Sequence, residues 1–324
     1  MLRPIKRKAP LAAVLALAGA VAVTAQTSPD TRADLARQVA AMRERYDATP
    51  DTPGTGPYPA IKTIDPAFPG YVTYRPKDLA ALGETRLGVV AWGNGACAAD
   101  GASARLELEE IASYGYLVLA PGTIRSGPDA PPHVDKTLPE DRMLPAETRP
   151  GALRRAIDLA LEANTSGAYA GRIDPRLIAV AGHSCGGLQA IAVAGDPRVR
   201  TVVIQNSGVF PDGTTPIEGM EIGKQTLATI HTPIIYILGG PRDVAYENGM
   251  DDFRRIGQVP VMVANIGVGH LGTFAEPNGG AAARVVVDWL QWRLRGDWQA
   301  AKTFVGPNCG LCRDPRWTIE RKGF

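Results

Sequence analysis

Histidine and cysteine are scarce in this sequence, with four of each among 324 residues. Beyond residue 25 there is no second long apolar run, no cluster of lysine and arginine, and no internal repeat. These absences argue against a multi-span membrane protein and against a surface for nucleic acid or anionic membranes. Apolar residues make up 45% of the chain, which is ample for a large buried core.

The first 25 residues have the pattern of a secretory signal. Four basic residues between positions 3 and 8 precede the apolar stretch Leu11–Val23, and Thr24 and Ala25 supply small residues before a cleavage site. A membrane anchor is the alternative, but the apolar stretch is shorter than the ~20 residues that a spanning helix needs. Removal of residues 1–25 takes away four positive and no negative charges, so the formal net charge changes from +2 to −2. We expect a soluble secreted or periplasmic protein.

Short apolar runs alternate with helical stretches between residues 60 and 294. Eight runs resemble buried strands: 60–64, 71–75, 87–92, 116–120, 177–181, 201–205, 234–238 and 261–266. Helices are expected at 103–113, 150–163, 188–194 and 281–294. This alternation predicts an α/β fold with a mostly parallel eight-stranded sheet and helices on both faces. The connection from 207 to 232 is too short for a large lid.

One pentapeptide, Gly182-His-Ser184-Cys-Gly186, has the G-x-S-x-G pattern of a nucleophile elbow. The apolar run at 177–181 precedes it and the expected helix at 188–194 follows it. A strand that turns abruptly into a helix brings backbone segments so close that only small residues fit at the two glycines. We therefore expect Ser184 to be lifted above the sheet edge as a nucleophile.

A serine nucleophile needs a base, normally histidine, and His270 is the best candidate. It follows the last expected strand within a glycine-rich loop, on the strand-end face that also carries Ser184. His183 is expected to pack beneath the elbow, His231 precedes a strand at the opposite sheet end, and His133 lies in a Pro-rich loop.

The carboxylate that orients the base should lie between Ser184 and His270 in sequence. Asp243 fits best because it follows Gly239-Gly240-Pro241-Arg242 in a tight turn after the strand at 234–238. Asp212 remains the main alternative. Glu247, Asp251 and Asp252 are more distant ones on the same connection.

An acyl-transfer site also needs donors for the developing oxyanion. The backbone N–H of Cys185, at the head of a helix, is one expected donor. The loop after the strand at 87–92 should supply the second, with Asn94 as first choice and Gly95 as second. Trp92 and Gly95 are candidates for lining the substrate site, and core packing is an equal alternative for Trp92.

The four cysteines allow three pairings in an oxidising compartment. Cys309 and Cys312 are close enough in sequence to bridge each other, which leaves Cys97 to pair with Cys185. A redox role for the CxxC sequence would require a strand-to-helix setting, which this turn-rich segment lacks. No further histidine or cysteine lies nearby to complete a zinc site.

These patterns divide the chain into four segments. A signal at 1–25 is followed by an N-terminal helix and a Pro/Gly-rich linker at 26–59. The catalytic domain is expected at 60–298, and a C-terminal tail with the CxxC sequence at 299–324.

The elbow, followed in order by an acid and a histidine after the last strand, resembles the α/β-hydrolase superfamily over residues 60–295. Within it, the short connection after Gln205 and the secretion signal resemble the lidless secreted cutinase and polyester-hydrolase branch. Enzymes similar to dienelactone hydrolase and platelet-activating-factor acetylhydrolase share much of the pattern. Bacterial cutinases commonly have Met and an aromatic residue where this chain has Cys185 and Asn94.

The resemblance implies a serine carboxylic-ester hydrolase that works through an acyl-enzyme, without a metal or organic cofactor. Its substrate would be a small-molecule or polymeric ester, and no nucleic acid or partner protein is implied. A peptidase or acyltransferase could use the same residues. A non-catalytic binding module and a CxxC thiol–disulfide protein are the alternatives from other classes.

Overall fold

The computed structural model describes residues 43–44, 46–131, 145–214 and 217–324. The expected signal at 1–25 lies outside these ranges, as do His133 and most of the expected N-terminal helix, which the sequence places at 31–46 within the segment 26–59. Among the residues that are described, no helix has both the length and the apolar character needed to cross a membrane.

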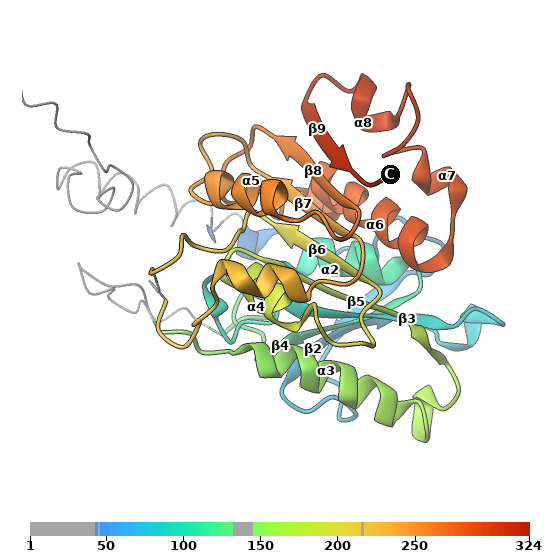
Figure 1. The fold of residues 1–324 in the computed structure, drawn as a ribbon. Coiled ribbons are helices and arrows are strands. Elements are labelled where there is room, and N and C mark those ends of the chain that lie inside the picture. Colours follow the sequence, from blue (N-terminus) through green and yellow to red (C-terminus); the bar gives the residue numbers. More distant parts are fainter. Residues whose placement is uncertain (1–42, 45, 132–144, 215–216) are drawn as a thin grey trace, which may run out of the picture. The chain divides into compact units, whose positions relative to one another are not determined.

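The described chain forms an α/β structure around one mostly parallel sheet of nine strands (Figure 1). The strand order is β1-β2-β4-β3-β5-β6-β7-β8-β9, and the six strands from β4 to β8 in this order are parallel to one another. The strands are β1 (Ala60–Thr63), β2 (Tyr71–Pro76), β3 (Leu87–Gly93), β4 (Tyr116–Pro121), β5 (Ile173–His183), β6 (Thr201–Gln205), β7 (Ile234–Leu238), β8 (Val261–Ile266) and β9 (Trp317–Lys322).

The prediction of eight strands was wrong by one, because β9 comes from the segment expected to be a tail. It pairs antiparallel with β8, from Val261 opposite Lys322 to Ile266 opposite Trp317. Its sequence, WTIERK, ends in three charged residues, so only Trp317 and Ile319 carry the apolar alternation of a half-buried strand. Charge is common on edge strands because it discourages pairing with other molecules.

Helices cover both faces of the sheet, as predicted (Figure 1). On one face lie α3 (Pro150–Ala163), α4 (Cys185–Val193) and α5 (Tyr246–Arg255), which contribute Leu153, Ile191 and Phe253 to one apolar core. On the other face α2 (Arg105–Ser113) and α6 (Gly280–Arg295) contribute to a second core. The short helices α7 (Trp298–Ala301) and α8 (Gly310–Arg313) lead from α6 to β9.

The segment before β1 wraps around α2 through polar contacts. The amides of Thr52 and Thr55 donate to the carboxylates of Glu109 and Glu110 at 3.0 and 2.7 Å. The fully buried Arg105 forms an ion pair with Asp51 at 2.7 Å. The Pro/Gly-rich segment is therefore fixed on the domain.

Candidate active site

The segment 182–186 has the predicted strand-to-helix form. Strand β5 ends at His183, α4 begins at Cys185, and Ser184 between them has φ 52° and ψ −122°. This positive φ is a strained conformation for a residue with a side chain. A Cβ atom on Gly186 would lie 2.0 Å from the carbonyl oxygen of Gly93, so the close approach of β3 to the elbow requires glycine there.

The structure brings Ser184, His270 and Asp243 into one hydrogen-bonded chain. The Oγ of Ser184 lies 2.9 Å from Nε2 of His270, and Nδ1 of His270 lies 2.6 Å from Oδ1 of Asp243. A carboxylate accepts from the protonated Nδ1, which leaves Nε2 free to accept the serine proton. The His270 side chain is 29% exposed whereas that of Asp243 is fully buried, so the serine end of the chain faces outward.

Asp243 is held ionised by donors from several segments. The amide of Ala245 donates to Oδ1 at 2.9 Å, and the amide of Gly239 donates to Oδ2 at 3.1 Å. Burial by itself would raise the pKa of Asp243, but hydrogen bonds from His270, the Ala245 amide and Asn206 outweigh it and lower the pKa to about 2. A permanently ionised acceptor therefore fixes the imidazole orientation.

The alternative acids lie elsewhere. Asp212 and Glu247 are exposed on the surface. Asp251 and Asp252 are both ion-paired with Lys224, at 2.8 and 2.7 Å. Of the acids weighed from the sequence, Asp243 is the one that contacts His270.

The other described histidines have the surroundings expected of them. His231 is exposed. His183 packs against His270 and Phe274, and its Nε2–H donates to the backbone carbonyl of His270 at 2.9 Å. Burial, with a smaller effect of His270, lowers the pKa of His183 to about 4, so its imidazole is neutral and supports the His270 loop.

The two expected oxyanion donors lie on segments in direct contact. Cys185 is the first residue of α4, and the first amides of a helix have no acceptor within it. A Cβ on Gly186 would lie 2.6 Å from the amide nitrogen of Asn94, which places this amide against the start of α4. The Asn94 side chain is buried and donates to the carbonyls of Ala98 and Pro121 at 2.9 and 2.7 Å, so it fixes the loop.

Disulfides join Cys97 to Cys185 and Cys309 to Cys312, as predicted. The first ties the Asn94 loop to the residue after Ser184, with 5.2 Å between the Cα atoms. Ala96 and Cys97 in this loop both have positive φ, 54° and 48°. Two adjacent left-handed residues with side chains are costly, so the loop needs outside constraints to keep this shape.

The two candidate lining residues, Trp92 and Gly95, differ in their burial. Trp92 is fully buried and packs edge-on against Phe274, as the core-packing alternative for this residue expects. Gly95 is half-buried, and a Cβ at this position would come within 2.7 Å of Nδ1 of His183. Its lack of a side chain makes room for that ring.

Sequence reasoning missed two residues beside the predicted triad. Asn206 and Ser207 directly follow β6, the strand between β5 and β7 in the sheet. Asn206 contacts Asp243, and Ser207 donates to the backbone carbonyl of Ser184 at 2.6 Å. Their position at the carboxyl end of a buried parallel strand is the signal that could have indicated them.

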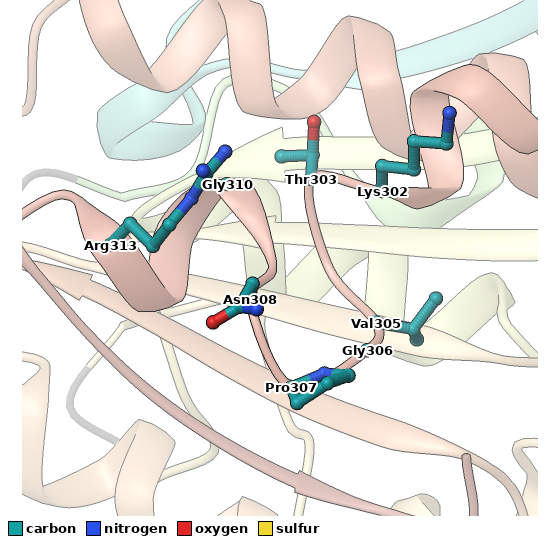
Figure 2. Close-up of a pocket in the computed structure, with 8 residues that line it drawn as sticks. All are labelled: Lys302, Thr303, Val305, Gly306, Pro307, Asn308, Gly310 and Arg313. Carbon is teal, nitrogen blue, oxygen red and sulfur yellow. The ribbon is translucent and has the colours of Figure 1, made fainter.

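A separate surface hollow of about 410 Å³ lies between residues 302–310 and α8 (Figure 2). Lys302 and Arg313 give it two basic side chains, and none of its lining residues belongs to the predicted site. Within the described ranges, no group of three or more His, Cys, Asp or Glu side chains is placed to hold a metal ion.

No protein-family model matches this sequence, and no curated protein is significantly similar to it.

Proposed function

We propose that this chain is an exported serine hydrolase that cleaves carboxylic esters through an acyl-enzyme. The observation that carries the proposal is the chain Ser184–His270–Asp243, with distances of 2.9 and 2.6 Å. Ser184 Oγ would attack the ester carbonyl carbon while its proton passes to Nε2 of His270. His270 then gives that proton to the departing alcohol. Water next gives a proton to His270 and attacks the acyl carbon; the bond to Ser184 Oγ breaks, the proton returns to Oγ, and the acid is released.

The surroundings of Ser184 suit the charge that develops during this attack. The carbonyl oxygen becomes an oxyanion, and the amides of Cys185 and Asn94 would donate to it. The sheet order, the strained elbow and the order Ser184, Asp243, His270 along the chain also support an α/β-hydrolase fold. The two disulfides support export to the periplasm or the extracellular space.

Apolar side chains beside the triad favour an ester with an apolar portion. Val244 follows Asp243 and is 78% exposed, and Val268 and Leu271 flank His270 with 42% and 48% exposed. The loops that carry them are joined by a hydrogen bond from the amide of Gly269 to the carbonyl of Gly239 at 2.7 Å. Exposed aliphatic groups gathered at a reactive centre are typical of contact with an apolar ligand.

Fluorophosphonate labelling tests the nucleophile directly. The purified chain should form one adduct, at Ser184, and the variant Ser184→Ala should form none. An adduct that persists in Ser184→Ala, or no adduct with the unaltered chain, would exclude this mechanism. Hydrolysis of aryl esters of increasing acyl length, beside a sugar acetate and a peptide amide, then identifies the substrate class.

A further inference from the structure

Residues at the end of strand β6 form hydrogen bonds with Ser184, with Asp243 and with Gly269, the residue before His270. In the sheet, β6 lies between β5, which leads to Ser184, and β7, which leads to Asp243; β8, which leads to His270, is next. The three residues Gln205, Asn206 and Ser207 therefore occupy the central place at the edge where these strands end. We call this tripeptide the β6 clamp.

The two outer residues of the β6 clamp hold the backbone of the nucleophile. The amide of Ser184 donates to the carbonyl of Gln205 at 2.9 Å. The hydroxyl of Ser207 donates to the carbonyl of Ser184 at 2.6 Å. Both polar groups of the strained Ser184 peptide backbone are thus fixed by residues on either side of Asn206.

The middle residue, Asn206, holds the acid and the base. Its Nδ2 donates to Oδ2 of Asp243 at 2.9 Å and to the backbone carbonyl of Gly269 at 3.0 Å. A side-chain amide nitrogen has two hydrogens, and both are used here. With Oδ2 fixed by Asn206, the other oxygen of Asp243 faces His270, and the Gly269 contact fixes the residue before His270.

The backbone of Asn206 shows how the side chain reaches these partners. Asn206 is 2% exposed and has φ 47°, a left-handed conformation that Asn tolerates better than most residues. The turn after β6 therefore directs the amide across the end of β7. An aspartate at this position would have the same shape but no hydrogen to donate, and its charge would face Asp243.

We propose that Asn206 is a positioning residue for the triad, and that the β6 clamp sets the mutual geometry of Ser184, Asp243 and His270. This inference rests on the proposed function. Asn206 is buried and does not face the substrate, so it acts on the chemical step through Asp243 and the His270 loop and has little part in substrate binding.

The first test compares kinetics of Asn206→Gly and Asn206→Asp on a small aryl acetate. Asn206→Gly tolerates the positive φ and removes the side chain with both of its hydrogen bonds, so kcat should fall about 10- to 100-fold, the change expected when a hydrogen bond to a charged group is lost, with KM within about threefold. Asn206→Asp should lose more. Asn278 is a matched control because it has φ 54° and its side chain makes no hydrogen bond in the described part of the chain. Asn278→Gly and Asn278→Asp should change kcat less than about twofold.

The second test is independent of turnover. Proton NMR should show the low-field Nδ1–H resonance of the bond between His270 and Asp243, assigned by its absence from His270→Ala. Asn206→Gly should shift or remove this resonance, whereas Asn278→Gly should retain it. Ser207→Ala should retain the resonance but lower kcat about 2- to 10-fold, because it loosens only the serine backbone. This variant also tests the clamp if substitutions of Asn206 prevent folding.

The outcomes separate the two proposals. Unchanged kcat and an unshifted resonance in Asn206→Gly would overturn the role of Asn206, even if Ser184 is labelled normally. If Ser184 is not labelled, the hydrolase proposal fails, and the resonance alone then decides whether Asn206 orients the pair of Asp243 and His270. The role of Asn206 would also be overturned if kcat fell equally in the Asn206 variants and in both Asn278 variants. The cause would then be the substitution of a residue with left-handed backbone and not the loss of the amide contact.

Discussion

Removal of the disulfide between Cys97 and Cys185 should destabilise the protein much more than removal of the one between Cys309 and Cys312. The first closes a loop with a sequence separation of 88 residues and the second a loop with a separation of 3. In the chain-entropy account, a cross-link stabilises by restricting the unfolded chain, and the effect grows with the logarithm of loop length. The two separations correspond to about 4 to 5 kcal/mol and about 1 to 2 kcal/mol.

The matched variants are Cys97→Ala with Cys185→Ala, and Cys309→Ala with Cys312→Ala. Urea unfolding followed by circular dichroism gives the free energy of unfolding of each, beside the unaltered protein with and without reductant. We expect a difference of about 3 kcal/mol between the two double variants. Equal losses, or a loss below about 1 kcal/mol for the first pair, would refute the entropic reasoning.

The same substitution should also affect the reaction. Ala96 and Cys97 each hold a left-handed conformation that costs roughly 1–2 kcal/mol, and the disulfide is one of the constraints that maintain it. Without the bridge, the loop can relax and the Asn94 amide can move away from the proposed oxyanion position. We therefore expect kcat to fall in the Cys97/Cys185 variant at temperatures where it remains folded, and kcat to stay unchanged in the Cys309/Cys312 variant.

Three further substitutions test other parts of the structure. Burial raises the pKa of Glu107 to about 8, above its unfolded value of about 4.5. The free energy of unfolding should therefore decline as pH rises from about 4.5 to about 8. Urea titrations at pH 5 and 8 should show a smaller decline for Glu107→Gln than for the unaltered protein. Gly186→Ala would place a Cβ 2.0 Å from the backbone of β3 and should abolish soluble expression or labelling. Gly151→Ala is the control, because its Cβ would meet no atom within 4 Å. Its melting temperature should rise, or fall by no more than about a degree. Asp252→Asn leaves the buried Lys224 without its closest carboxylate. The free energy of unfolding, measured by thermal unfolding, should fall by about 3 kcal/mol or more. A fall below about 1 kcal/mol would show that the remaining contact with Asp251 suffices.

Local patterns in the sequence were sufficient to predict the elbow and its partners. The glycines around Ser184 and the apolar run before them define a strand-to-helix turn, and Asp243 and His270 directly follow buried strands. Because parallel strands end at one edge, residues far apart in sequence meet there. The disulfide between Cys97 and Cys185 could be predicted from the cysteine count, since the other two cysteines lie three positions apart and can bridge each other.

Other features depend on tertiary contacts that no local pattern reports. The left-handed turn at Asn206 and its two hydrogen bonds arise only when β6 lies between β5 and β7. Trp92 packs against Phe274, which is distant in sequence. The charged residues Glu-Arg-Lys in β9 do not have the apolar pattern of a strand. The segment forms a strand because it pairs with the otherwise unpaired edge of β8.

The pairing of β9 with β8 limits how the chain can be shortened for expression or fusion. Deletion after residue 298 would uncover the backbone of β8, whose apolar residues would then form an open edge, and such edges template aggregation. A shortened chain would therefore be expected to precipitate even if its triad region were intact. Tags and partners are better attached beyond Phe324, where they leave the protective strand in place.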